Sequence, residues 1–344
     1  MCIRDRLDVI SVYGADALRF TLVTGNSPGN DLRFSEEKVS ASRNFANKIW
    51  NAARFILMNI EGKDIDCALP KKLYTSDKWI LNRFNNVTAA VTENLEKFEL
   101  GMAVSKLYDF IWDDFCDWYI ELAKIRMNGA DEESADSARR VLVWTMSNTL
   151  KLLHPFMPYI TEEIWQTLPH DGEALIVAKW PEYDEALSFP QEAKNLENVM
   201  ALIRAIRTRR NEMNVPPSKK AHIYIDTAHP APYEEASEFI ARLAYGSKVE
   251  IGMGFDVQGA VTAVTDDAKA LLPMDDLVDK AAETARLNKE LANAQKQLDT
   301  VKAKLANEKF TSKAPQNVID GVRANGEKLE AKIKLILETL ESYQ

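Results

Sequence analysis

The sequence predicts a mainly α-helical fold with three parts in order along the chain: a helical bundle, a small α/β module and a C-terminal antiparallel coiled-coil hairpin. Apolar residues recur three and four positions apart through most of the first half, which is typical of amphipathic helices. Two long runs with heptad spacing close the chain and indicate two helices that pack along each other. A short run of alternating apolar residues between these regions favours a strand.

Residues 7–34 are predicted to form two short helices and then a loop rich in glycine, asparagine and proline. Gly14 separates the helices, because glycine adopts the left-handed conformation that ends a helix without steric cost. Ser35 precedes two glutamates, so it is predicted to cap the N-terminus of the next helix. Residues 1–6 do not continue the amphipathic pattern that begins at Leu7, and we expect them to be non-native.

The second segment, residues 35–190, is helical throughout its first 130 or so positions and is predicted to form an up-and-down bundle. The fourth helix ends at His154, because the residue before a proline resists the helical conformation. Thr161 is expected to open a short fifth helix. The apolar stripe of the first long helix contains Phe45, Ile49, Ala52, Ala53 and Ile56.

The sequence pattern changes at residue 191, and residues 191–273 are predicted to form a small α/β module. A helix over 196–213 is followed by the alternating run 221–225, which predicts a strand. A helix through 236–243 and two short strands, at 249–251 and 259–264, complete this prediction.

Residues 274–344 carry the heptads. Each of the two helices would be about 45 Å long if it holds 30 residues. A break at 312–315 is predicted to turn the chain back on itself. The apolar positions are Leu287, Leu291, Ala294, Leu298, Val301 and Leu305, then Val322, Gly326, Leu329, Ile333, Ile336, Leu340 and Tyr343.

The composition excludes several classes of protein. No apolar run approaches the roughly 20 residues that span a bilayer, so we expect no membrane partner. Cys2, Cys67 and Cys116 lie far apart, which argues against a zinc site or a disulfide framework and favours a cytoplasmic protein. The formal net charge of −9 decides little, because local basic surfaces govern contact with phosphate.

Four blocks of sequence resemble the class I aminoacyl-tRNA synthetases, and most closely the bacterial valyl enzymes. The second and third blocks are shared with isoleucyl and leucyl relatives, whereas the 29–34 loop, the 43–51 helix and the coiled-coil tail favour the valyl type. The isoleucyl relatives commonly carry a cysteine-rich C-terminal zinc module, which is absent here. The blocks are 13–20 with 29–34 and 43–51, then 112–121, 152–165, and 204–216.

The resemblance implies a tRNA-binding C-terminal part of an enzyme that attaches valine to tRNA. Residues 1–34 would follow the catalytic domain, 35–190 would bind the anticodon, and 274–344 would form a tRNA-binding arm. The H-x-G-H and K-M-S-K-S motifs, which in the family bind ATP, do not occur in this sequence. The chain alone is therefore expected to be inactive and to hold no metal or cofactor, with ATP and Mg²⁺ bound by the missing catalytic domain. It is expected to act as a monomer that binds tRNA-Val.

The candidate anticodon-binding face lies on the 35–60 helix, where polar residues at spacings of four, four and three lie opposite much of the apolar stripe. Guanidinium groups pair with phosphate and stack on bases, and amides read the edges of unstacked bases. Lys48 would add a phosphate contact, and Trp50 would either stack on a base or lie in the core. The candidates on this helix are Arg43, Asn47, Lys48, Trp50, Asn51 and Arg54.

Two further basic sets are candidate contacts to the tRNA backbone. Arg204, Arg207 and Arg210 cluster on the 196–213 helix, where the alternative is packing against acidic neighbours. Lys289, Lys296 and Lys302 decorate the first coiled-coil helix, where the alternative is an ordinary heptad flank. The resemblance implies that this arm touches the outer corner of the L-shaped tRNA.

Two alternative hypotheses about the function stay open. One is a synthetase fragment of the isoleucyl type. The other is a non-enzymatic adaptor whose coiled coil binds a protein, since heptads alone do not specify a partner. Asp113, Asp114 and Asp117 are expected to be a solvated helix edge and not a cation site, and His154 is expected to have a capping or core role.

Overall fold

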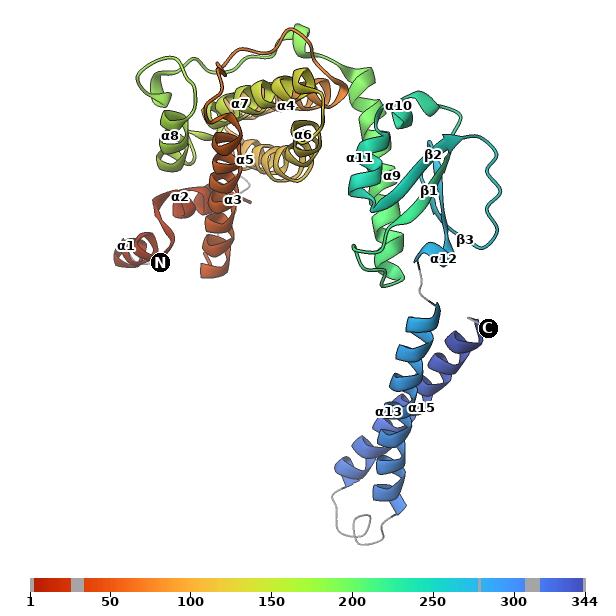
Figure 1. The fold of residues 1–344 in the computed structure, drawn as a ribbon. Helices are drawn as coiled ribbons and strands as arrows, with labels where there is room; N and C mark the ends of the chain where they lie inside the picture. Colours follow the sequence, from red (N-terminus) through yellow and green to blue (C-terminus); the bar gives the residue numbers. More distant parts are fainter. Residues whose placement is uncertain (1–2, 26–33, 278–279, 307–315, 343–344) are drawn as a thin grey trace. The chain divides into compact units, whose positions relative to one another are not determined.

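The computed structural model describes residues 3–25, 34–277, 280–306 and 316–342 (Figure 1). They form two compact units, one made of 1–204 with 229–244, the other of 205–228 with 245–344. The mainly α-helical fold with a small mixed sheet is confirmed. No helix in the described ranges is both long and apolar enough to cross a membrane.

The first unit is a bundle of helices (Figure 1). Gly14 separates the first two helices with φ of 90° and ψ of 156°, so its φ is positive as predicted but its ψ is extended and not left-handed helical. The elements are α1 (Ile3–Tyr13), α2 (Ala15–Val23), α3 (Glu36–Ile60), α4 (Thr75–Glu96), α5 (Leu100–Asp109), π-helix η1 (Phe110–Tyr119), α6 (Ile120–Met127), α7 (Glu132–Leu153), α8 (Pro158–Thr167), the 3₁₀ turns η2 (Leu175–Val177) and η3 (Glu185–Leu187), α10 (Pro230–Glu235) and α11 (Ser237–Leu243).

The helix starts and stops follow local chemistry. The hydroxyl of Ser35 accepts a hydrogen bond from the backbone N–H of Lys38, which confirms the predicted N-cap of α3. The end of α7 at Leu153, with His154 as its C-cap, is also confirmed. The start of α8 was predicted wrongly: the helix begins at Pro158 and not at Thr161, because proline at the first helical position has no N–H to satisfy.

Helices α5, η1 and α6 form one continuous helical segment whose middle is wound as a π-helix. Hydrogen bonding from i to i+5 brings residues four and five apart into line. Phe110, Phe115 and Tyr119 have this spacing, and all three are buried. The segment thus turns a broad aromatic face into the bundle.

The second unit contains a four-stranded sheet in the order β2-β1-β4-β3. β1 and β2 are parallel, while β4 is antiparallel to both β1 and β3. The strands at 221–225, 249–251 and 259–264 are confirmed, but β4 was missed, because it is a five-residue run without alternation. The bounds are β1 (Ala221–Asp226), β2 (Gly246–Gly252), β3 (Ala260–Val264), β4 (Lys269–Pro273) and the short helix α12 (Met274–Leu277).

Helices α10 and α11 connect β1 to β2 along the chain but belong to the first unit, where α11 packs on α6. The helix α9 (Pro190–Glu212) has residues in both units. The structure therefore groups these elements differently from a module at 191–273, and the four-part division of the chain stays a prediction.

The coiled-coil hairpin consists of α13 (Lys280–Ala306) and α15 (Gln316–Ser342), which lie side by side (Figure 1). Leu298, Val301 and Leu329 form its buried centre. Gly326 is also buried, and a Cβ atom there would lie 3.2 Å from Cγ1 of Val301. The predicted break at 312–315 lies outside the described residues.

Candidate nucleic-acid interface

One face of α3 is exposed over most of its length, and four of the predicted contact residues lie on it. Arg43, Asn47, Asn51 and Arg54 are all exposed, while the stripe at 45, 49, 52, 53 and 56 is buried. The guanidinium of Arg43 lies over the ring of Tyr13, 5.5 Å from its centroid. Asn47, Asn51 and Arg54 make no hydrogen bond or ion pair with any described residue. Their polar groups are therefore available to a ligand.

The environment of Lys48 differs from the one we predicted, in which its ammonium group would be free to contact phosphate. Its ammonium group lies 2.7 Å from Oδ1 of Asp117 and 3.7 Å from the centroid of the Trp112 ring. The charge is therefore already neutralised and stacked within the bundle. Trp50, in contrast, is 45% exposed, so the core alternative for this ring is wrong and its face is accessible.

Below the exposed face, aromatic rings fix the position of α3. Phe45 stacks on Phe20, with ring centroids 4.9 Å apart, and lies 4.8 Å from Tyr108. Tyr108 stacks in turn on Trp112 at 5.5 Å. Offset aromatic pairs of this kind add specific geometry to ordinary burial. The polar residues of α3 are thus presented by a packed and oriented helix.

The three arginines of the predicted basic cluster on α9 have different environments in the structure. The guanidinium of Arg204 lies 4.7 Å from the centroid of Trp118, and Arg207 is exposed without an ion pair or hydrogen bond to a described residue. Arg210 is only 2% exposed, and it donates hydrogen bonds to the carbonyl oxygens of Pro216 and Lys219. Burial lowers the pKa of its guanidinium. The prediction of a phosphate contact at Arg210 is therefore corrected: this residue holds the turn after α9.

The three predicted lysines of the coiled coil are all exposed on α13. Lys302 lies 2.9 Å from Oε1 of Glu330 on α15, so it bridges the two helices of the hairpin. Lys289 and Lys296 have no ion pair or hydrogen bond to the described part of the chain. Of the three lysines, Lys289 and Lys296 are therefore the ones without a neutralising partner in the described ranges.

Of the three acidic residues of η1, Asp113 and Asp117 are exposed as expected for a solvated helix edge, but Asp114 is not. Asp114 is 13% exposed at its side chain and pairs with Arg83 at 2.8 Å, while Asp117 pairs with Lys48. Burial raises the pKa of Asp114. Among the described residues no group of three His, Cys, Asp or Glu side chains could hold a metal ion. His154 has the predicted structural role, with its Nδ1 2.8 Å from Oγ1 of Thr161.

A buried polar network, which sequence reasoning missed, joins α4, η1, α6 and α7. The carboxylate of Asp77 accepts hydrogen bonds from Arg126, from the Tyr119 hydroxyl at 2.7 Å and from Ser137 at 2.9 Å. Burial raises the pKa of Tyr119 well above its usual value, so the hydroxyl keeps its proton and donates. Helical spacing gives no sign of this network, because its members lie up to 60 positions apart.

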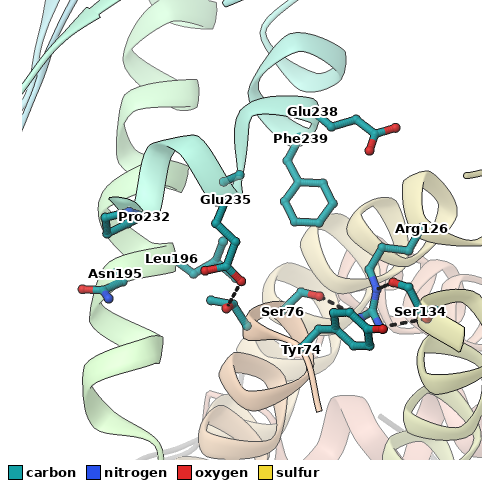
Figure 2. A pocket seen from close by; sticks show the side chains of 12 residues that line it. Tyr74, Ser76, Arg126, Ser134, Asn195, Leu196, Pro232, Glu235, Glu238 and Phe239 are labelled. Atoms are coloured by element: carbon teal, nitrogen blue, oxygen red, sulfur yellow. Dashed lines mark hydrogen bonds between the residues drawn. The ribbon is translucent and has the colours of Figure 1, made fainter. Parts of the chain in front are cut away.

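A cavity of about 180 Å³ lies beside this network, between the start of α4 and the helices α10 and α11 (Figure 2). Arg126 reaches its wall but donates inward, to Ser76 and to Ser134, each at 2.9 Å. Thr75 donates to the carboxylate of Glu235 across it. Five of the polar side chains that line this cavity are thus hydrogen-bonded to one another, and we interpret the cavity as a gap between packed helices.

Known proteins match this chain in two separate regions. Residues 77–225 match the family described as the anticodon-binding domain of tRNA ligase. Residues 279–343 match the family described as the valyl tRNA synthetase tRNA binding arm. The bundle after α3 and the hairpin therefore match domains of tRNA ligases. The exposed face of α3 lies outside both matched ranges.

Comparison with whole curated proteins shows which kind of tRNA ligase this chain is similar to. The valine–tRNA ligase of Clostridium acetobutylicum is 45% identical over 345 residues, which is 99% of this chain and 39% of that protein. The enzyme of Listeria monocytogenes is 45% identical over 347 residues, and that of Bacillus subtilis is 44% identical over 333. The chain belongs to the valine–tRNA ligase family and matches a C-terminal part of its members. It spans about two fifths of the length of these relatives.

Proposed function

We propose that this chain binds tRNA-Val, with the exposed face of α3 on the anticodon stem-loop and the coiled-coil hairpin on the tRNA body. In the whole enzyme this part positions the tRNA while ATP-dependent ligation of valine proceeds elsewhere, with Mg²⁺. We also propose that it acts as a cytoplasmic monomer. The free thiols of Cys67 and Cys116 are compatible with a reducing compartment.

The observation that carries the proposal is the unpaired polar surface of α3. Two amides and the guanidinium of Arg54 point away from a buried aromatic stack and are not neutralised by any described residue. Proteins read RNA sequence mainly in single-stranded loops, where base edges are exposed to amides and base faces to guanidinium groups.

The test is a filter-binding titration with a tRNA-Val transcript. We expect the double variant Arg43→Ala/Arg54→Ala to bind about tenfold or more weakly and to lose part of the salt dependence, since two phosphate or base contacts disappear. Arg242→Ala is the matched control, because it removes an exposed arginine from α11. Equal affinity of the double variant and the control variant would refute the assigned face.

Two further measurements address specificity and chemistry. Competition between tRNA-Val and tRNA-Ile transcripts should favour tRNA-Val, and equal competition would argue for a general RNA-binding surface. Pyrophosphate exchange should show no valine-dependent turnover by this chain alone, because the sequence has no H-x-G-H motif to stabilise the charge that develops on ATP. Turnover above background would contradict this part of the proposal.

A further inference from the structure

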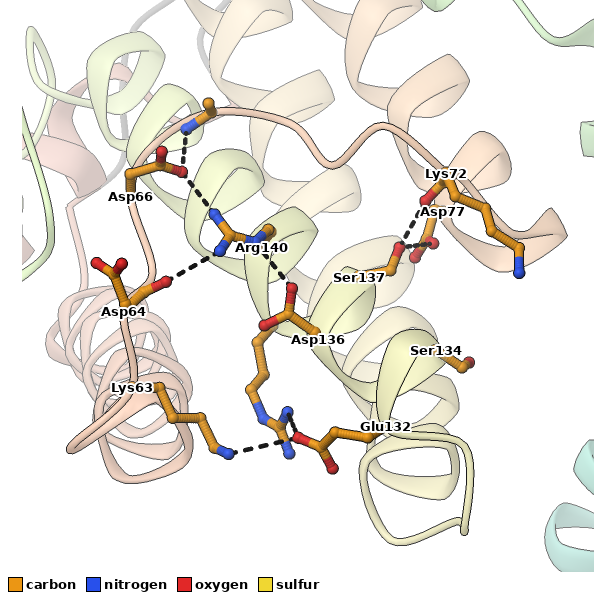
Figure 3. A network of polar contacts seen from close by, with 12 residues as sticks. Lys63, Asp64, Asp66, Lys72, Asp77, Glu132, Ser134, Asp136, Ser137 and Arg140 are labelled. Atoms are coloured by element: carbon orange, nitrogen blue, oxygen red, sulfur yellow. Dashed lines mark hydrogen bonds and ion pairs between the residues drawn. The ribbon is translucent and has the colours of Figure 1, made fainter.

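Among the described residues three arginines are buried, and Arg210 differs from the other two. Arg126 pairs with the carboxylate of Asp77 at 2.5 Å. Arg139 pairs with Glu132 at 2.7 Å, in the polar network on α7 that Figure 3 shows. Arg210 has no carboxylate partner in the described ranges, and its Nη1 makes no hydrogen bond there. A buried charge is normally paired, so this guanidinium carries a positive charge that no described acidic residue neutralises.

The turn that follows α9 is built on this guanidinium. Nη2 of Arg210 donates to the carbonyl oxygen of Pro216 at 3.2 Å and also to that of Lys219. The N–H of Lys219 donates to the same Pro216 oxygen at 3.0 Å, which closes a β-turn over Pro217 and Ser218. Two carbonyl oxygens of the turn are therefore occupied by the arginine beneath it.

The exposed part of this turn carries unpaired hydrogen-bond donors. Ser218 and Lys220 are both exposed, and Lys219 is half-buried. The N–H and the hydroxyl of Ser218 make no hydrogen bond with a described residue, and neither lysine has an ion pair within the described ranges. An anion at this turn would therefore meet these donors together with the charges of two lysines and of Arg210.

The conformation of the segment is fixed before any ligand binds. Asn214 has a φ of 55°, in the left-handed region that asparagine adopts more readily than most residues. The N–H of Val215 donates to the carbonyl of Arg210 at 2.9 Å, and the Val215 side chain is buried. The ring of Tyr245 lies 5.4 Å from the guanidinium carbon. The turn is thus ordered by its own contacts, so an anion would not have to order it.

We propose that the turn at 216–220 binds one phosphate group, with Ser218 and Lys220 as its contacts and Arg210 as the positioning residue. The inference rests on the proposed function and adds a contact outside both the α3 face and the coiled-coil hairpin. Backbone N–H groups, hydroxyls and lysines are the usual partners of nucleic-acid phosphates. Arg207, exposed and three positions before Arg210, adds positive charge on the same side of α9. The phosphate group belongs to the backbone of the bound RNA or to a free phosphate ion.

The first test is a salt series of filter-binding titrations with the tRNA-Val transcript. Lys220→Ala should weaken binding about fivefold and lower the slope of log K against log salt by about one unit. Lys269→Ala is the matched control, because Lys269 is exposed on β4 in the same unit and has no ion pair in the described ranges. Equal slopes for Lys220→Ala and wild type would overturn the proposal.

The source of the phosphate is decided by the backbone amide resonance of Ser218. Inorganic phosphate and the transcript are titrated separately into the chain. A shift with both, together with competition between them, assigns a site that also takes the free ion. A shift with the transcript alone assigns the RNA backbone. No shift with either would refute the site.

The positioning role of Arg210 has its own readout. Arg210→Gln should lower the salt slope as much as Lys220→Ala does, although both lysines remain. Arg210→Lys should restore the slope, because an ammonium group can donate to the same two carbonyls. Hydrogen exchange over 211–222 should be faster in Arg210→Gln than in Arg210→Lys. A purely structural role would lower the stability of both variants and leave the slope unchanged.

The outcomes separate this site from the proposed function. If Arg43→Ala/Arg54→Ala weakens tRNA binding but neither Lys220→Ala nor the Ser218 resonance responds, the turn is not a phosphate site and the proposed function stands. If inorganic phosphate shifts Ser218 but no transcript binds the chain, the phosphate site stands and the proposed function is wrong.

Discussion

The carboxylate of Asp16 on α2 accepts a hydrogen bond from the backbone N–H of Ile160 on α8 at 2.7 Å, and a second from Tyr159 at 3.3 Å. Arg19, one turn further along α2, donates to the carbonyl oxygens of Pro155 and Phe156. Two blocks of sequence that carried the family resemblance, 13–20 and 152–165, therefore meet in one junction. Their shared role is to fix the first turn of α8 to α2.

Replacing Asp16 by alanine should lower the free energy of unfolding by about 1–2 kcal/mol, because two N–H groups at the start of α8 lose their acceptor. Urea unfolding measures the change. Asp8→Ala is the control, since Asp8 is exposed on α1, and it should change the stability little. A similar loss in both variants would show that the α2–α8 junction does not contribute.

His154 should make the stability depend on pH. Burial lowers the pKa of His154 below its usual value of 6.5. The unfolded chain therefore binds a proton at a higher pH than the folded chain does, so the contribution of neutral His154 is complete above pH 6.5 and is lost as the pH falls towards the lower folded value.

The measurement is urea unfolding near pH 7.5 and near pH 5.5, for wild type and for His154→Gln. Wild type should lose more stability on acidification than the variant does. Parallel losses in the two proteins would mean that other groups account for the pH dependence.

Two glycines of α15 should respond differently to alanine. A Cβ at Gly321 meets nothing within 4 Å, so Gly321→Ala should stabilise the hairpin by about 0.5–1 kcal/mol through helix propensity. A Cβ at Gly326 would lie 3.2 Å from the Val301 side chain, and this crowding should offset the same gain. Hydrogen exchange of peptides from α13 and α15 measures both. Equal protection in the two variants would contradict the close approach of the helices.

Substitutions of two lysines on α13 should have different effects on tRNA binding. Lys296→Ala should reduce the slope of log K against log salt for tRNA by about one unit if Lys296 contacts a phosphate. Lys302→Ala should change the slope less, because Glu330 already pairs with Lys302. The comparison is a salt series of binding titrations with both variants. The reverse order of effects would place the tRNA on the other side of α13.

Local sequence patterns predicted most of the secondary structure. The Ser35 cap, the end of α7 before Pro155 and the heptads of α13 and α15 each depend on residues within a few positions, and sequence periodicity reports such short-range relationships directly. The family, too, was apparent from contiguous blocks. The strand β4 escaped prediction because its five residues do not alternate between apolar and polar, so periodicity gives no signal for it.

The sequence by itself therefore determined the helices, their buried stripes and the family, since these follow from near neighbours along the chain. Only the tertiary structure decided which charged groups are free. Lys48 is neutralised by Asp117, 69 positions away, and Arg210 is buried by the turn it holds, whereas Arg54 is exposed and has no partner among the described residues. The physical reason is that the availability of a charge depends on which opposite charge the fold brings within a few ångströms, and that distance is not encoded in local spacing.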